Sequence, residues 1–195
     1  IKINEIQNLA SAKIMADSKL IERKKQIIRQ LINENDFELS ETEAKSLVGL
    51  DDDADTLLAE VYYHKGKSST DSVEKKNNYY LVLDLCENGN VKSSFDSLKN
   101  ELLDDLTSLS KSAYDDVREQ EAYEIADRIK SYSQFWLPLY ISLRQKDLSR
   151  VESLGQKIKF EEESIAQISD TIGNSKSIEN PVYFELWDNY IDLLY

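Results

Sequence analysis

The sequence predicts an all-α protein, and three observations support that fold class. Apolar residues recur at spacings of three, four and seven along most of the chain, which places them on one face of an α-helix. Only 5 Gly and 2 Pro occur among 195 residues, so long regular elements are favoured over loops. No stretch alternates between apolar and polar residues for long enough to predict a strand. We expect about seven to nine helices, forming a bundle or a stack of antiparallel helical hairpins.

The first expected element is a long helix over residues 3–33. Its apolar stripe consists of Ile3, Ile6, Ala10, Ile14, Ile21, Ile28 and Leu31. Such spacing is typical of coiled coils, so residues 3–33 could join two copies as a homo-oligomer. The chain is expected to form one domain over 1–195, with a sub-boundary near 34–40 between this helix and the helical body.

Two helices are expected next. Ser40-Glu41-Thr42-Glu43 has the form of a capping box, in which the Ser hydroxyl and the Glu carboxylate bond to backbone N–H groups at a helix start. A helix should run from there to about Val48. The acidic run 51–55 precedes another helix, which Lys65-Gly66-Lys67 closes with positive charge and a glycine.

The middle of the sequence also shows N-cap signals and helical apolar spacing. Ser68–Asp71 offers an N-cap for a helix whose buried side reaches Cys86. After Gly89-Asn90, apolar residues repeat at helical spacing, and Val117 and Tyr132 belong to that stripe. These patterns predict further amphipathic helices.

The last third predicts three more helices. Residues 135–143 are apolar on almost every side, so that helix should be central, with Pro138 opening or kinking it. Asp147 is expected to start the next helix. Asn180-Pro181 is a strong start signal for a terminal helix, with Asn as N-cap and Pro at the first helical position.

One part of the pattern consists of Tyr80, Leu83, Cys86, Gly89-Asn90, Ser94, Leu98 and Leu102. It resembles part of a tetratricopeptide repeat, in which two antiparallel helices nest closely across a tight turn. Segments 58–66 and 139–154 echo it, and the resemblance implies stacked hairpins. The turns at 66, 89 and 146 lack a constant period, so we do not assign the family. A non-repetitive bundle with the same turn chemistry is an equal alternative.

The net charge of the chain indicates which kinds of partner it can bind. There are 37 acidic and 24 basic residues, which gives a net charge of −13. This charge repels nucleic acid and attracts a protein with a basic surface, although it also serves solubility. The one basic cluster contains Lys19, Arg23, Lys24, Lys25 and Arg29. We interpret that cluster as the solvated side of the first helix.

Cys86 is the only cysteine, so the chain has no intramolecular disulfide and suits a reducing compartment. No apolar run is long enough to span a membrane, and the first residues lack the layout of a signal peptide. We therefore expect a cytoplasmic or otherwise intracellular protein.

The sequence predicts no catalytic, cofactor-binding or metal site. His64 is the only histidine, so neither a zinc site with several His ligands nor a di-iron site can be built. No glycine-rich phosphate loop occurs. The run 51–55 has the acidic spacing of a calcium loop, but Thr56 and Tyr62 occupy the positions that need Gly and Glu. We interpret it as an acidic helix start.

We therefore expect a non-enzymatic, acidic module for protein–protein interaction, such as an inhibitor or chaperone-like partner of a basic protein. Aromatic residues are favoured interface anchors, and carboxylates attract a basic partner. The candidate partner-binding residues are Tyr183, Phe184, Trp187, Tyr190, Tyr195, Asp51, Asp52, Asp53 and Asp55. The alternatives are a structural or oligomerising subunit of a larger assembly, and an enzyme or metal binder that uses carboxylates.

Overall fold

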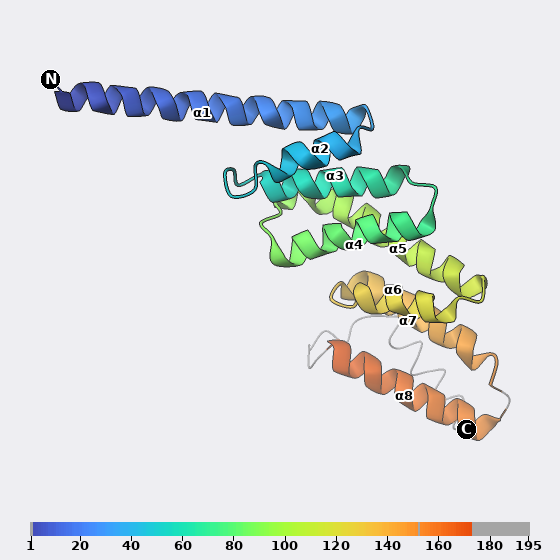
Figure 1. Ribbon diagram of the computed structural model, residues 1–195. Coiled ribbons are helices and arrows are strands. Elements are labelled where there is room, and N and C mark those ends of the chain that lie inside the picture. The colour runs from blue at the N-terminus through green and yellow to red at the C-terminus, as the bar shows by residue number, and fades with distance from the viewer. Residues whose placement is uncertain (1, 152, 173–195) are drawn as a thin grey trace. The chain divides into compact units, whose positions relative to one another are not determined.

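The computed structural model describes residues 2–151 and 153–172, and this part of the chain forms eight α-helices, one short 3-10 helix and no strand. The all-α class and the expected number of helices are confirmed (Figure 1). The chain divides into two compact units, Ile1–Leu102 and Leu103–Tyr195. That the whole chain folds as one domain stays a prediction.

Helical hairpins build the first unit. Its elements are α1 (Lys2–Asn33), α2 (Phe37–Lys45), α3 (Ala54–Ser68), α4 (Ser72–Asn88), the 3-10 helix Ser93–Phe95 and the start of α5 (Asp96–Asp115). Buried residues such as Ile28, Leu57, Tyr63 and Leu83 form its core. The α3–α4 hairpin is especially close, because a Cβ on Gly66 would lie 2.7 Å from Cε1 of the buried Tyr79 ring.

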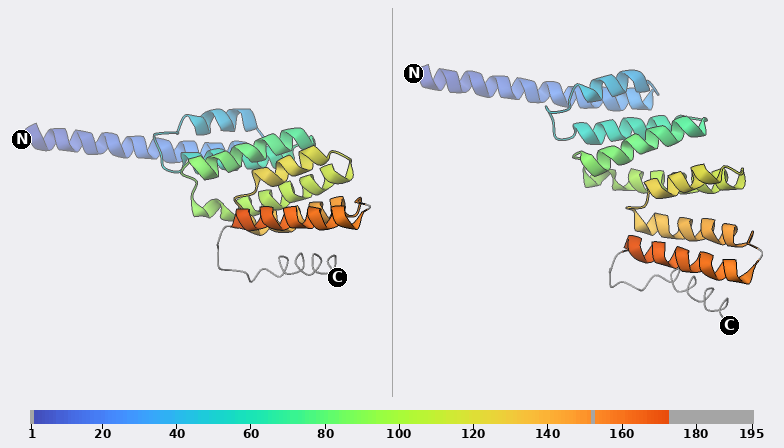
Figure 2. Two further views of the ribbon diagram at one scale, coloured as in Figure 1. Left: turned by 90° about the horizontal axis from the view of Figure 1, so that it is seen from below. Right: turned by 60° about the horizontal axis from the view of Figure 1, so that its bottom comes forward.

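The long N-terminal helix is confirmed as α1. Ile28 and Ile32, in its C-terminal half, are buried against the rest of the unit. Its N-terminal part runs past α2 and α3 in every view (Figures 1 and 2). The helix therefore extends beyond the elements that cover its C-terminal half.

The second unit contains the end of α5 together with α6 (Glu119–Arg128), α7 (Ser133–Leu148) and α8 (Leu154–Ile172). Pro138 lies inside α7 rather than at its start. Trp136 and Leu139 of α7 are fully buried, as expected for a helix that is apolar on almost every side.

Three local predictions were wrong. Helix α2 begins at Phe37 with Asp36 as N-cap, and Ser40 lies inside the helix, where its hydroxyl donates to the Phe37 carbonyl oxygen. Asp147 belongs to the last turn of α7 and does not start α8. Val117 lies in the turn between α5 and α6 at φ 64°, with 78% of its surface exposed, and is not part of a buried stripe.

Among the described residues, no helix is both long enough and apolar enough to cross a lipid bilayer.

Candidate functional site

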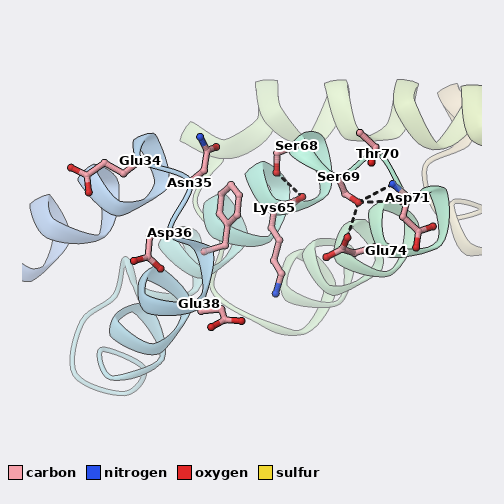
Figure 3. Close-up of a pocket in the computed structure, with 11 residues that line it drawn as sticks. Glu34, Asn35, Asp36, Glu38, Lys65, Ser68, Ser69, Thr70, Asp71 and Glu74 are labelled. Carbon is pink, nitrogen blue, oxygen red and sulfur yellow. Dashed lines mark hydrogen bonds between the residues drawn. The ribbon is translucent and has the colours of Figure 1, made fainter.

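An open hollow of the first unit lies where two interhelical turns meet. The turn between α1 and α2 and the turn between α3 and α4 line an open space of about 760 Å³ (Figure 3). The lining residues are Glu34, Asn35, Asp36, Phe37, Glu38, Lys65, Ser68, Ser69, Thr70, Asp71 and Glu74. We call this space the acidic hollow, because five carboxylates and one lysine surround it.

A left-handed residue and two N-cap hydrogen bonds define the conformations of the two turns. Asn35 adopts φ 60°, a left-handed conformation that Asn tolerates better than most residues, and it reverses the chain after α1. The Asp36 carboxylate accepts a hydrogen bond from the Leu39 N–H at 3.2 Å and caps α2. The Asp71 carboxylate accepts from the Val73 N–H at 2.9 Å and caps α4 in the same way. The N-cap expected within Ser68–Asp71 is thus Asp71.

The remaining carboxylates of the hollow keep capacity for a further partner. Glu34 accepts one hydrogen bond from Gln30 Nε2 at 2.8 Å, and Glu74 accepts one from the Ser69 hydroxyl at 2.8 Å. Each carboxylate has two oxygens and can accept several hydrogen bonds, so one contact does not saturate it. In the view of Figure 3, Lys65 lies between Glu38 on one side and Glu74 on the other.

A polar cluster centred on Glu41 lies beside the hollow. The Glu41 carboxylate accepts from Lys45 Nζ at 2.6 Å and from the Tyr62 hydroxyl at 3.0 Å, and Lys65 Nζ lies 3.6 Å away. Burial by itself raises the pKa of this carboxyl, but the hydrogen bonds and the positive charges outweigh it and lower the pKa below the ordinary value. Lys65 therefore lines the hollow and also pairs with the Glu41 carboxylate beside it.

Three of the four predicted aspartates take part in internal contacts. Lys25 Nζ lies 2.9 Å from Asp51 Oδ1 and 2.8 Å from Asp53 Oδ2. Asp53 also pairs with Lys92. The Asp55 carboxylate accepts from the Asn90 N–H at 2.8 Å.

The fourth, Asp52, is exposed. The internal contacts of Asp51, Asp53 and Asp55 do not test whether these residues bind a partner. Partner binding by the four aspartates therefore stays a prediction. The predicted aromatic residues Tyr183, Phe184, Trp187, Tyr190 and Tyr195 lie outside the described residues.

Lys25 departs from our interpretation of the basic cluster as a solvated face. Only 6% of its surface is exposed. Burial by itself lowers the pKa of its ammonium group, but hydrogen bonds to Asp51 and Glu22 outweigh it and raise the pKa. Lys25 is therefore a structural ion-pair residue rather than a solvated charge.

His64 and Cys86, the two single-copy residues considered for catalysis, are half-buried. Burial raises the pKa of the Cys86 thiol, which reduces the thiolate fraction that a nucleophile requires. No group of three or more His, Cys, Asp or Glu that could hold a metal ion occurs in the described part of the chain.

A second polar cluster, in the second unit, could not be anticipated from the sequence. The hydroxyls of Tyr114 and Tyr123 both donate to the Asp147 carboxylate, which joins α5 and α6 to α7. Burial and the hydrogen bond to Asp147 raise the pKa of both phenols. Lys146 pairs with Asp115, and Arg150 pairs with Glu119. These internal contacts give the cluster a structural role.

Comparison of the chain with protein-family models, curated proteins and solved structures found no significant match. The partial resemblance to a tetratricopeptide repeat is therefore not supported by a family match. The acidic hollow, with five carboxylates from two turns and from the helices that flank them, is the feature on which a function can be argued.

Proposed function

We propose that this chain is a non-enzymatic protein-interaction module whose acidic hollow receives a basic segment of a partner protein. The observation that carries the proposal is the gathering of five carboxylates around an open space with a single lysine. Long-range attraction from a chain of net charge −13 would speed the encounter with such a partner.

The chemistry of the hollow favours Lys and Arg side chains. Glu34, Glu38 and Glu74 can form charge-assisted hydrogen bonds with ammonium or guanidinium groups, which are stronger than bonds between neutral groups. Lys65 would repel a second cation at the centre and direct the basic side chains of the partner to the two acidic sides. An inhibitor or chaperone-like role follows if the captured segment is one that the partner needs for its own activity.

Binding of a fluorescent peptide of alternating lysine and serine to the full chain tests this proposal. The double variant Glu38→Gln/Glu74→Gln removes two charges from the hollow and leaves both N-caps intact. We expect it to bind about tenfold more weakly, because each lost charge pair at a partly screened site contributes about 1 kcal/mol or less. Added salt should weaken wild-type binding.

The matched control is Asp104→Asn/Asp170→Asn, which removes two charges at exposed positions in the second unit. Equal loss of binding in both double variants would show that net charge alone acts, and that result would contradict a site at the hollow. Binding that does not respond to salt would also contradict the proposal.

A second candidate function is that of an oligomerising subunit, and the length of α1 favours it. A helix of 32 residues extends about 48 Å at 1.5 Å per residue. Part of it runs past α2 and α3, and helices gain most of their stability from packing. In the sequence, the apolar spacing of the first helix continues back to Ile3. Light scattering of the full chain tests this candidate, since a mass that stays monomeric at all concentrations would rule it out.

A further inference from the structure

Helix α8 packs against α7 in the second unit (Figures 1 and 2), and an ionisable side chain is enclosed at this contact. Hydrogen bonds join the two helices: the Tyr140 hydroxyl donates to Gln167 Oε1, and Arg144 Nε donates to Ser164 Oγ at 2.7 Å. Glu161 lies one turn before Ser164 and therefore shares its face of α8. Only 2% of the Glu161 surface is exposed.

The Glu161 carboxyl lacks the partners that a buried charge needs. Its Oε2 atom has no hydrogen-bond partner among the described residues. The Arg144 guanidinium is committed to other atoms of α8, because it bonds to Ser164 and, at 3.4 Å, to the Phe160 carbonyl oxygen. Its central carbon also lies 3.5 Å from the centre of the Phe160 ring. Burying a carboxylate without a hydrogen-bonded cation is costly, so Glu161 ionises more easily when water reaches it.

Charges on the two helices do not remove this cost. Arg144 stabilises the ionised carboxylate, but burial has the larger effect and raises the pKa of Glu161 above the ordinary 4.5. The other ionisable groups of α7 and α8 have contacts of their own or reach solvent. They are Tyr140, bonded to Gln167; Lys146, paired with Asp115; Asp147, bonded to Tyr114 and Tyr123; Lys157, half-exposed one turn before Glu161; Lys159, which lies 3.9 Å from Glu163; and the exposed Glu162 and Asp170.

Proton binding by Glu161 is therefore coupled to the docking of α8. Because the pKa of this carboxyl is higher in the docked state than in water, docking keeps its full strength below pH 4.5. As pH rises from there through the raised pKa, the carboxyl must ionise in its enclosed site, and docking is weakened. Local opening of α8 would give the carboxylate access to water, and single helices can open in this way without global unfolding.

We propose that α8 is an acid-closing latch, which stays docked on α7 while Glu161 is protonated and opens in a growing fraction of molecules once Glu161 is ionised. Opening uncovers the face of α7 that carries Tyr140 and Arg144, because both contact α8. That face is therefore more accessible at neutral pH than in acid. The acidic hollow lies in the first unit, so the inference does not depend on the function proposed above.

Hydrogen exchange of the full chain, followed by mass spectrometry, tests the latch between pH 4.5 and about pH 7.5. Exchange rates are corrected for the effect of pH on unprotected amides, so that the remaining protection reports the open fraction of each helix. We expect protection of α8 to fall by up to about tenfold for each pH unit until it levels off, because opening releases one proton. Protection of α7 should fall less, since α7 also packs against α6.

Variants at two neighbouring positions separate the latch from other effects of pH. Glu161→Gln keeps the shape of the side chain but cannot ionise, so protection of α8 should be the same at every pH. Glu161→Met also removes the charge and should lose the pH dependence as well. Glu162→Gln, at the exposed neighbouring position, is the matched control and should behave as wild type. Circular dichroism confirms that each variant is folded.

Three results would each overturn the inference. One is protection of α8 in the wild type that does not change with pH. Another is an unchanged pH dependence in a folded Glu161→Gln or Glu161→Met variant. The third is an equal loss of protection in α7 and α8, because the helices would then unfold together and α8 would not open by itself.

Discussion

Lys25 Nζ lies 2.8 Å from Asp53 Oδ2 and so joins the C-terminal half of α1 to the N-terminus of α3. The lysine side chain is almost fully buried, and Asp51 and Glu22 complete its surroundings. Without this lysine, the carboxylates of Asp51 and Asp53 would lie close together with one fewer compensating cation.

Replacing Lys25 should destabilise the first unit. We expect Lys25→Met to lower the free energy of unfolding by about 2 kcal/mol, because removing one member of a buried ion pair leaves the others uncompensated. Urea unfolding measures the change. Lys19→Met, at an exposed position of the same helix, should change it by less than about 0.5 kcal/mol. Equal effects of the two variants would refute the structural role of Lys25.

Gly66 allows α3 and α4 to approach each other, so a methyl group should not fit there. An added Cβ would lie 2.7 Å and 2.8 Å from two ring carbons of Tyr79, whose ring is fully buried. We expect Gly66→Ala to cost about 2 kcal/mol. Gly155→Ala in α8 is the control, since no atom lies within 4 Å of its added Cβ. That variant should stabilise the protein by about 0.5–1 kcal/mol through helix propensity, and thermal unfolding compares the two.

Val117 adopts a backbone conformation that a β-branched residue rarely adopts. Its φ is 64° and its side chain is exposed, so little burial is lost on replacement. Val117→Gly should raise the free energy of unfolding by about 1 kcal/mol, because the left-handed conformation carries no penalty in glycine. The converse variant Asn35→Val, at φ 60°, should destabilise. A destabilised Val117→Gly protein would show that the turn gains more from the side chain than it loses in strain.

The tyrosines that share Asp147 should make stability fall at alkaline pH. Their pKa values are raised above the ordinary 10.0, so the unfolded chain loses these protons first as pH rises. Stability is therefore retained below pH 10 and decreases above it. Tyr123→Phe should flatten this dependence, as measured by urea unfolding across that pH range. Tyr132→Phe is the comparison variant, and an equal flattening by it would argue against a special role of Tyr123.

Glu161 is a buried carboxyl whose Oε2 has no hydrogen-bond partner. Burial raises its pKa above the ordinary 4.5, so folding favours the protonated form and is opposed at neutral pH. We expect Glu161→Met to stabilise the protein by about 1 kcal/mol at pH 7, with a smaller gain as pH falls towards 4.5. Glu162→Met, at the exposed neighbouring position, is the comparison variant in thermal unfolding at pH 7, and equal stabilisation by both variants would contradict the role of burial at Glu161.

Much of the helical fold could be predicted from local patterns. The apolar spacing of residues 3–33 predicted α1 almost to its ends, and Asp71 capped α4 within the expected segment. The start of α2 was misplaced because Asp36 and Ser40 are both good N-cap residues. Ser40 is fully buried within the helix, so packing rather than capping preference decided where α2 begins.

The candidate site was not predictable in the same way. Glu34 and Glu38 lie more than 30 residues from Asp71 and Glu74, and nothing local to either pair indicates that they surround one space. Asp51 and Asp53 both contact Lys25 from a different helix, and no local pattern in the sequence indicates that contact. Only the packing of α1 against α3 brings that lysine to them.

The sequence by itself determined the helical class and the negative charge, because helix periodicity and ionisation are properties of short segments and single side chains. The tertiary structure decided which carboxylates gather around open space and which are matched by a buried lysine. That outcome depends on how helices distant in sequence align when their apolar faces pack, and the alignment is set by contacts across the core rather than by neighbours along the chain.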